Sequence, residues 1–229
     1  MAGVENHLRR TPLRSALDRY DVDWTAIGDA AVVAKARSSA DPRALAIADL
    51  SPLPRIGFKG RETVPAMQKR GIALEATANR AFRQADGSLC LVLAASEIVM
   101  LGPLSGDNTA IEKLIGSWSI DDGERTFPVL RRDGNAWFAI SGHKAPQLFA
   151  KICGVDVRTT RFVDLSIAQT SIAKLNAILA RSDVGSTPVY HLLADSASGL
   201  YLFECLMDAA SEFGGGICGL NSIRELETS

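Results

Sequence analysis

The sequence is poor in the features that mark disulfide-stabilised, secreted and membrane-spanning proteins. Cysteine is scarce among the 229 residues, with neither a CxxC pair nor the density of a disulfide framework, at positions Cys90, Cys153, Cys205 and Cys218. Three of these lie in apolar runs, which predicts buried, unpaired thiols in a reducing cytoplasm. No apolar run reaches the roughly eighteen residues of a membrane span. No apolar core follows the early charges Glu5, His7, Arg9 and Arg10, so we expect no secretory signal. The sequence therefore predicts a cytoplasmic protein without a membrane partner.

An excess of charge of one sign is also missing. Lys and Arg number 25 against 26 Asp and Glu, which gives a formal net charge of −1. A nucleic-acid-binding protein would show a basic stripe, so we expect no nucleic-acid partner. Hydrophobic residues make up 47% of the chain, enough to bury the core of one large domain or of two fused halves.

Nucleotide-binding motifs are missing as well. No GxGxxG follows a predicted strand, so the chain has no dinucleotide fingerprint. The triple glycine at 214–216 follows a predicted helix and lacks the Lys-Ser/Thr of a phosphate-binding loop. We interpret it as a helix stop.

The three histidines, His7, His143 and His191, form no HxH or HExxH group, and we expect no metal site. His143 lies at a predicted helix start, where it could donate to an anion or face solvent. His191 lies within an apolar strand, which favours a hydrogen-bonded core histidine.

Nucleophilic catalysis has no clear candidate either. Ser141 lies in Ile-Ser-Gly-His rather than in the GxSxG of a nucleophile elbow, and Cys153 ends an apolar helix face, where a thiol stays neutral. The acidic pairs are placed in predicted loops or tails, at Asp121 with Asp122 and Glu225 with Glu227. The sequence thus predicts no catalytic, cofactor-binding or metal-binding residue in this chain.

The sequence does contain a segment used twice, about eighty residues apart. The copies are residues 55–60 (RIGFKG) and 137–142 (WFAISG). Each has the pattern of a short strand, a glycine turn and a helix with a proline in its first turn, and the likeness continues to Gly71 and Gly154. We therefore predict an α+β fold of two β-α-β-β-α halves with sheets of mixed direction.

The remaining pattern divides the chain into four parts. We interpret residues 1–44 as an N-terminal arm, 45–120 as the first half, 126–216 as the second half and 217–229 as a C-terminal tail. Strands are predicted at 44–50, 55–58, 89–93, 98–101, 137–140, 167–179 and 187–193. Helices are predicted at 145–152, from Ser196 or Ser198 to about Phe213, and after Asp107 or Asn108, where Ile111, Leu114, Ile115 and Trp118 share one face.

An ordered series of segments resembles the gamma subunit of heterotetrameric sarcosine oxidase. It comprises 47–51 (IADLS) with 55–60, 138–142 leading to 148–157 (LFAKICGVDV), and Phe162 followed by Ala-Gln-Thr at 168–170. Thr-Pro-Leu at 11–13 is similar to the Ser-Pro-Leu opening of that family. The resemblance covers roughly residues 10–213 and implies a folate-binding, aminomethyltransferase-type fold, which is itself built from repeated halves.

The resemblance implies a role in a four-subunit flavoenzyme that oxidatively demethylates sarcosine to glycine. Its products would be hydrogen peroxide and either formaldehyde or 5,10-methylenetetrahydrofolate. Partner subunits (alpha, beta and delta) would accompany this chain and hold the NAD, FAD, FMN and tetrahydrofolate, while the gamma subunit would carry no cofactor and act in assembly. Part of the contact with those partners is expected from the arm, through Leu8, Leu13, Leu17 and Trp24.

The chain departs from an active aminomethyltransferase at one position. Where such enzymes carry an Asp-Asp strand after a glycine, this chain has Gly-Ser-Leu-Cys-Leu at 87–91. An unpaired buried carboxylate is costly, so a site without its ligand is expected to become apolar, and we interpret the pocket as retired. We also expect the C-terminal β-barrel that would close a folate pocket to be missing. Two alternatives remain: the equivalent subunit of a related dehydrogenase, such as one for N-methylglutamate, and a free-standing folate-binding, aminomethyltransferase-like enzyme.

Overall fold

The computed structural model of the chain describes residues 9–228. A short helix and a hairpin come first: α1 (Arg14–Leu17), β1 (Val22–Ile27) and β2 (Ala30–Ala36). The first half follows with β3 (Ala46–Asp49), β4 (Arg55–Lys59), α2 (Thr63–Lys69), β5 (Arg80–Arg83), β6 (Leu89–Ala94), β7 (Glu97–Leu101) and α3 (Thr109–Gly116). The second half contains β8 (Phe127–Val129), β9 (Asn135–Ser141), α4 (Ala145–Ile152), β10 (Ile167–Ile172), β11 (Leu175–Arg181), β12 (Val189–Asp195) and α5 (Gly199–Ser211). The chain ends with β13 (Gly216–Ile217) and α6 (Leu220–Arg224), and its 3₁₀ turns are η2 (Ile120–Asp122), η3 (Ser196–Ser198) and η4 (Glu225–Thr228).

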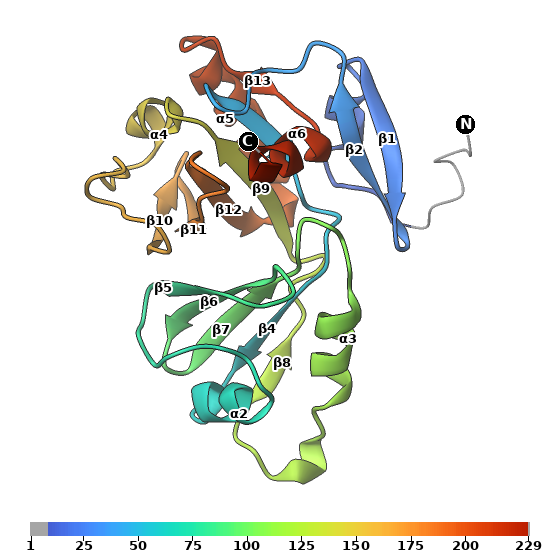
Figure 1. Cartoon of the computed structure of the whole chain (residues 1–229), viewed down its shortest axis with the longest axis vertical. Coiled ribbons are helices and arrows are strands. Elements are labelled where there is room, and N and C mark those ends of the chain that lie inside the picture. The colour runs from blue at the N-terminus through green and yellow to red at the C-terminus, as the bar shows by residue number, and fades with distance from the viewer. Residues whose placement is uncertain (1–8, 229) are drawn as a thin grey trace.

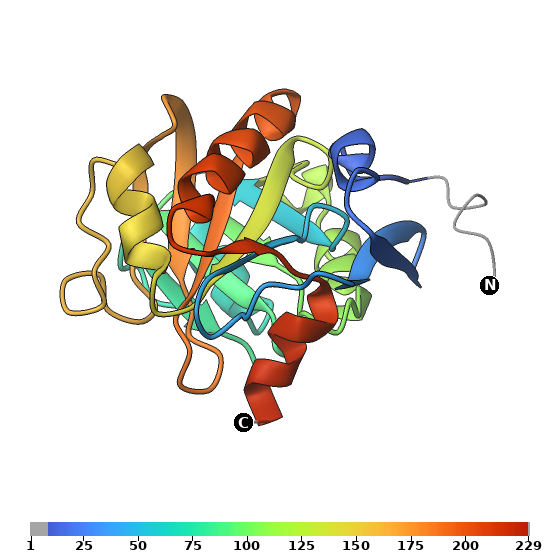
Figure 2. The same cartoon turned by 90° about the horizontal axis from the view of Figure 1, so that it is seen from above.

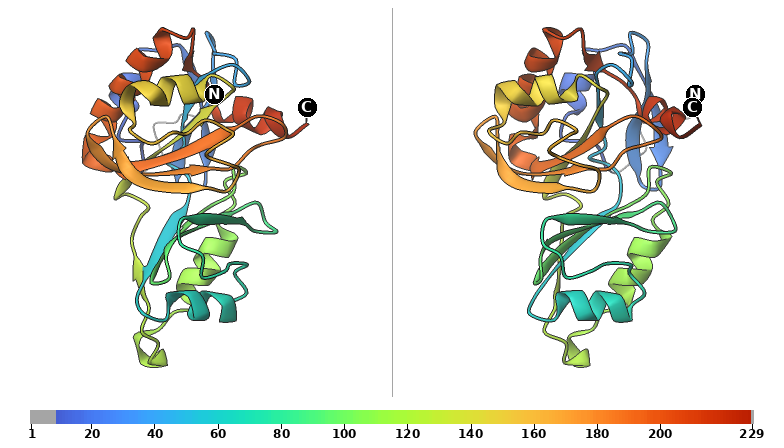
Figure 3. Two further views of the ribbon diagram at one scale, coloured as in Figure 1. Left: turned by 90° about the vertical axis from the view of Figure 1, so that its left-hand side faces the viewer. Right: turned by 60° about the vertical axis from the view of Figure 1, so that its left-hand side comes forward.

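Two large sheets stack on each other, with helices on both outer faces (Figures 1 and 3). The six-stranded sheet has the order β10-β11-β12-β9-β3-β13 and the five-stranded sheet the order β5-β6-β7-β4-β8. Strand β13 runs parallel to β3, and the other pairs of both sheets are antiparallel. The predicted α+β class with repeated halves and mixed strand direction is therefore confirmed.

The two halves exchange their first strands. Strand β3 precedes β4 in the chain but pairs with β9 of the second half, whereas β8 precedes β9 but pairs with β4 of the first half. Each half therefore has the element order β-β-α-β-β-β-α, which contains two more strands than the predicted β-α-β-β-α unit. Because each sheet is completed by a strand from the other half, the halves are parts of one folding unit.

The prediction of one long strand over 167–179 is wrong. The chain reverses at Ala173 and Lys174, whose φ angles are 49° and 66°, and β10 and β11 pair as a hairpin around them. A two-residue turn with both φ angles positive matches the right-handed twist of paired strands, but it is usually built from Gly or Asn. Neither residue is present here, so the sequence carries no turn signal.

The predicted helices are present in the structure, but some of them end at other residues than predicted. The helix predicted over 145–152 is α4, whereas α3 ends at Gly116, so Trp118 lies beyond it and Ile115 is 42% exposed. Ser198 is the N-cap residue of α5, but its side chain makes no cap bond. Within the described part of the chain, no helix is long and apolar enough to cross a membrane.

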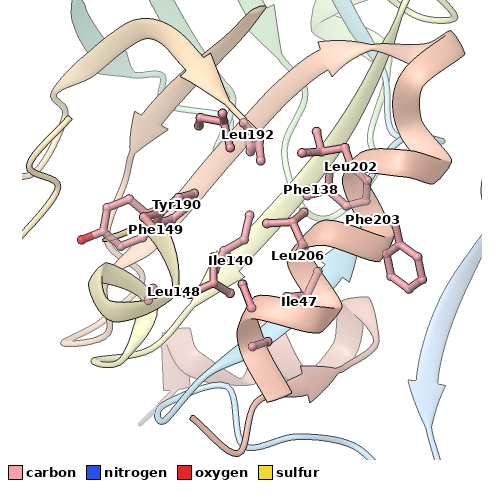
Figure 4. Close-up of a cluster of buried hydrophobic side chains, with 14 of the residues drawn as sticks. Ile47, Phe138, Ile140, Leu148, Phe149, Tyr190, Leu192, Leu202, Phe203 and Leu206 are labelled. Atoms are coloured by element: carbon pink, nitrogen blue, oxygen red, sulfur yellow. The ribbon is translucent and has the colours of Figure 1, made fainter. Parts of the chain in front are cut away.

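Strand alternation sorts the buried side chains into three layers. On β9, Phe138 and Ile140 face the layer beneath α4 and α5, whereas Trp137 and Ala139 face the layer between the sheets. A third layer lies between the five-stranded sheet and the helices α2 and α3. Figure 4 shows part of the first layer, and Figure 2 shows α4 and α5 lying across its sheet from above.

The described part of the predicted arm belongs to the protein's own core. Leu13 and Leu17 are 0% and 2% exposed and pack in the layer beneath α5. Half-buried Trp24 has the Arg14 guanidinium 4.3 Å from its ring centre. The expectation that Leu13 and Leu17 contact a partner is therefore wrong, and Leu8 lies outside the described residues.

Candidate functional site

A cavity of about 690 Å³ opens between the two sheets at one end. We call it the inter-sheet cavity. The β5–β6 turn and the segment after β7 form one wall, and β9, β12, the 182–185 loop and α6 form the other. Its lining residues are Arg83, Gln84, Asp86, Gly87, Ser88, Leu89, Leu101, Gly102, Pro103, Leu104, Ser105, Trp137, Ser182, Asp183, Val184, Gly185, His191, Arg224 and Glu227.

His191 is a buried polar side chain in the wall of the inter-sheet cavity. It is 6% exposed, and its Nδ1 accepts a hydrogen bond of 3.2 Å from Nε1 of Trp137. The predicted hydrogen-bonded core histidine is thus confirmed. Burial, and then the charge of Arg83, lower the pKa of His191 to about 4, so the ring is neutral at pH 7. An indole N–H only donates, so the ring's own proton is on Nε2.

Local strand geometry explains this pairing. Along β12, Val189, His191 and Leu193 point between the sheets, while Tyr190 and Leu192 point to the helices. Trp137 is directly opposite Leu193 on β9 and therefore diagonal to His191, within reach of a large aromatic side chain. The sequence placed His191 in a strand, but only the strand register brings Trp137 to it.

The rim of the inter-sheet cavity is charged. Arg83 donates to Asp164 at 2.9 and 3.0 Å and to the carbonyl of Asp183 at 3.0 Å. Nε and Nη2 of Arg224 both donate to the carbonyl of Leu104, at 2.8 and 2.5 Å. Both guanidinium groups thus fasten loops of the rim, while remaining part of the cavity wall.

Two buried charged side chains, Asp49 and Arg55, lie where the chain crosses between the sheets. The pKa of Asp49 is raised by burial, although its carboxylate accepts from Thr11 and from the amide of Ser51. Arg55, 2% exposed, has a pKa lowered to about 10, also by burial. Its guanidinium donates to five main-chain carbonyls, those of Ser51, Leu53, Arg131, Arg132 and Asn135. With all five of its bonds directed at main-chain carbonyls, Arg55 holds the two crossing connections together.

The segment 87–91 lies where the resemblance expects paired carboxylates. Leu89 is part of the cavity wall, and Cys90 points to the opposite side of the sheet, into the third core layer. Burial raises the pKa of the Cys90 thiol to about 12, so it is neutral and unreactive. Neither Leu89 nor Cys90 therefore offers an acid or a base at neutral pH.

The other residues weighed in the sequence lie apart from one another. Ser141 is fully buried, and its hydroxyl has no partner among residues 9–228. His143 is exposed, with Nδ1 2.8 Å from the carbonyl of Arg43. Cys153 is half-buried at the end of α4, and Asp121 and Asp122 form the exposed turn η2. Of the pair near the C-terminus, Glu227 reaches the cavity rim, and Glu225 lies beside it in η4.

Across the described residues, no three His, Cys, Asp or Glu side chains gather closely enough to hold a metal ion. The polar groups of the inter-sheet cavity are a neutral imidazole, several hydroxyl and amide side chains, and charged rim residues, of which Arg83 and Asp183 are ion-paired. Such a set can bind and orient a small molecule through hydrogen bonds. The sequence analysis missed the cavity, because its lining comes from six separate segments of the chain.

Comparison with solved structures identifies the type of fold that the chain has. No protein-family model matches the chain, and no curated protein matches it. Among solved structures, it is similar to a chain of the heterotetrameric sarcosine oxidase from Corynebacterium sp. U-96 in complex with pyrrole 2-carboxylate. The TM-score is 0.68 at 17% identity, over 90% of this chain and 96% of that chain.

The chain is also similar to the glycine cleavage system aminomethyltransferase T from Bartonella henselae. The TM-score is 0.72 at 14% identity, over 96% of this chain and 62% of that one. At such low identity these matches show the fold alone. The chain has the aminomethyltransferase-like fold.

Proposed function

We propose that this chain is the non-catalytic gamma subunit of a heterotetrameric sarcosine oxidase. The observation that carries the proposal is the extent of the match to the sarcosine oxidase chain, which covers 96% of that chain. By contrast, the chain spans 62% of the aminomethyltransferase it matches. The apolar residues Leu89 and Cys90 at the position of the expected carboxylates also favour a role without catalysis.

In this proposal the chemistry belongs to partner subunits (alpha, beta and delta) that hold FAD, FMN, NAD and tetrahydrofolate. The cofactors held by those partners would supply the oxidation of sarcosine to glycine, with dioxygen as the oxidant that is reduced to hydrogen peroxide. The one-carbon unit would be released as formaldehyde or taken up as 5,10-methylenetetrahydrofolate. The present chain contributes surface to the assembly.

Exposed apolar side chains on the α3–β8 side support an assembly role. Ile120 is 73% exposed and Phe127 49% exposed, and the Phe127 ring packs edge-on against Trp118, with ring centres 6.2 Å apart. Ile115 on α3 is 42% exposed one turn before Trp118. Several exposed apolar side chains within one stretch of chain, here residues 115–127, are what a surface covered by a partner would present. We call Ile115, Trp118, Ile120 and Phe127 the α3–β8 patch.

The test is co-purification through a tag on this chain from cells that express it at its native level. We expect two larger, yellow, flavin-bearing chains in the eluate, and peroxide production that depends on sarcosine. Ile120→Glu and Phe127→Glu should each reduce the recovered flavin severalfold. Val163→Glu, 50% exposed on the other half, should leave the recovered flavin unchanged.

Three outcomes would contradict the proposal: a tagged chain without flavoprotein partners, an isolated chain that oxidises sarcosine, or one that binds tetrahydrofolate with measurable heat at millimolar ligand. A complex that prefers N-methylglutamate would identify the equivalent subunit of a related dehydrogenase, the alternative within the same class.

A further inference from the structure

A second cavity, with a volume of about 660 Å³, lies beside helix α4. Its walls are formed by α4 with the preceding His143, by residues 158–160 and by residues 186 and 188, and Arg181 of β11 lies among them. We call it the α4 cleft. Arg181 shares its face of β11 with Ala177 and Leu179, which point to the helices. The α4 cleft therefore lies on the opposite side of the sheet from the inter-sheet cavity, and the two share no lining residue.

The ionisable side chains that line the α4 cleft are all basic. They are His143, Arg158 and Arg181, and no Asp or Glu of residues 9–228 is part of the lining. Both arginines have carboxylate partners, but Asp156 lies outside the lining and Asp183 belongs to the wall of the inter-sheet cavity. The positive end of each ion pair is thus the end nearer to the α4 cleft, which favours an anion there.

Arg158 has donors to spare for such an anion. Its Nε and Nη2 donate to the Asp156 carboxylate at 2.9 and 2.6 Å, while Nη1 has no acceptor within the described part of the chain. The side chain is 71% exposed, so it can turn toward a ligand without disturbing the core. Arg161, one turn further along, forms no ion pair with any described residue, so the segment 156–161 carries a net positive charge.

Arg181, by contrast, is fixed, and it holds one wall of the α4 cleft in place. Its side chain is 9% exposed and donates to the Asp183 carboxylate at 2.7 and 2.6 Å. Nη1 donates to the carbonyls of Thr159 and Phe162 at 3.1 and 2.8 Å. These bonds tie the segment 159–162 to β11 and thereby keep its side chains beside the α4 cleft.

Three hydroxyl groups of the lining are free to bind a ligand. They belong to Thr159, Thr160 and Ser186, which are exposed, and none of them is hydrogen-bonded to another described residue. The amides of His143 and Lys144, just before α4, are already used by main-chain carbonyls at 3.0 Å. Side chains, rather than the start of the helix, would therefore hold the ligand.

This set of donors suits a phosphate group better than a carboxylate. A phosphate monoester carries a charge of about −1.5 to −2 at pH 7 and has three terminal acceptor oxygens, and guanidinium groups bind it bidentately. A carboxylate has a single charge and two oxygens, so it would leave more of the hydroxyls unused. Pro146, Ala150 and Pro188 supply apolar contacts, and the volume lies within the roughly 300–1,000 Å³ usual for small-molecule sites.

We propose that the α4 cleft binds a small organic phosphate monoester, with its phosphate on Arg158 and the hydroxyls of Thr159 and Thr160 and its organic part against Pro146 and Pro188. The site goes beyond the assembly role, since it lies within one chain and uses no residue of the α3–β8 patch. Its test and the co-purification test can therefore fail independently.

Three probes test the ligand class on the full chain: phenyl phosphate, benzoate and inorganic phosphate. Nitrogen-15 NMR titrations in about 0.15 M salt, where distant surface charges are screened, follow the amides of Thr159, Thr160 and Ser186 and the Nε signals of Arg158 and Arg181. We expect phenyl phosphate to shift these signals to saturation. Benzoate should bind at least about tenfold more weakly, because it has fewer oxygens and less charge. Inorganic phosphate should also bind more weakly, because it lacks the apolar ring.

The matched pair of variants is Arg158→Gln and Arg37→Gln. Both arginines are 71% exposed and paired with an aspartate, but Arg37 lies outside the α4 cleft. Arg158→Gln should weaken phenyl phosphate binding about tenfold or more, whereas Arg37→Gln should leave it unchanged. Asp156→Asn should tighten binding about threefold, because it removes a competing negative charge from Arg158.

The proposal would be overturned if phenyl phosphate left the signals of the α4 cleft unshifted, or if Arg158→Gln and Arg37→Gln had the same effect. Benzoate binding as tight as phenyl phosphate would overturn the assignment to phosphates. Weaker binding by Asp156→Asn would contradict the role given to the charge of Arg158. All the substituted side chains are exposed, so the variants are expected to fold.

Discussion

Gly60 and Gly142 occupy the same place in the two halves, and each lies against the main chain of a strand exchanged from the other half. A β-carbon on Gly60 would collide with the carbonyl oxygen of Arg125, just before β8, and one on Gly142 with the carbonyl of Ala44, just before β3. Their φ angles, +152° and +107°, also disfavour other residues. The glycine repeated in the sequence is thus explained by the strand exchange.

Gly60→Ala and Gly142→Ala should each lower the free energy of unfolding by more than about 2 kcal/mol, because both the backbone angle and the contact resist a methyl group. Gly71→Ala isolates the angle, since Gly71 has φ +83° and open space around it. Its cost should be about 1 kcal/mol. At Gly154 neither the backbone angle nor a close contact opposes a methyl group, so Gly154→Ala should leave the free energy of unfolding nearly unchanged. Urea unfolding measures all four, and equal losses at Gly60, Gly142 and Gly71 would contradict the role of the exchanged strands.

Leu13→Ala tests whether the N-terminal segment is part of the folded unit. Leu13 is fully buried in the first core layer, so the truncation should cost about 2–5 kcal/mol in unfolding free energy. Leu130→Ala is the matched control, since Leu130 is 83% exposed and should change stability by less than about 0.5 kcal/mol. A detachable arm would instead make the two variants equally stable.

Arg55→Lys should destabilise the protein although the charge is kept. Lysine cannot reach the five carbonyls that the guanidinium satisfies, and its own buried charge would lack partners. We expect a loss of about 3–5 kcal/mol in unfolding free energy. Arg37→Lys, on a side chain that is 71% exposed, should have little effect. If thermal melting of the two variants were indistinguishable, Arg55 would not hold the crossing connections.

Stability should fall as the pH decreases from about 6.5 to about 4, because of His191. Its pKa is lowered from the ordinary 6.5 to about 4 in the folded state, so in this window the unfolded chain binds the proton and the folded chain does not. The full effect, below pH 4, is about 3 kcal/mol.

Urea unfolding of the unaltered chain and of His191→Gln at pH 7.5 and pH 4.5 measures the contribution of His191 to the pH dependence of stability. Asp49, whose pKa is raised by burial, acts in the opposite direction but is present in both proteins. The difference between the two proteins therefore isolates His191. If acid destabilises both by the same amount, the lowered pKa is not the cause.

Local features of the sequence predicted individual elements well. The apolar run over 89–93 and the i, i+3, i+4, i+7 face over 145–152 gave β6 and α4, since each pattern reflects which side of one element is buried. One local signal was overlooked. Gly28 and Asp29 separate β1 from β2 as a two-residue hairpin loop, with φ +56° at Gly28, and this dipeptide between apolar runs is typical of a hairpin.

The sequence by itself determined the duplicated units, the α+β class and the burial of the apolar runs, because these depend on residues close together in the chain. Tertiary structure decided that β3 and β8 exchange halves, and that Trp137 meets His191 beside a cavity. Those outcomes depend on strand register between segments more than fifty residues apart, as for the 54 residues between Trp137 and His191. Strand pairing over that sequence distance depends on the packing of the whole core, so short-range sequence patterns do not predict it.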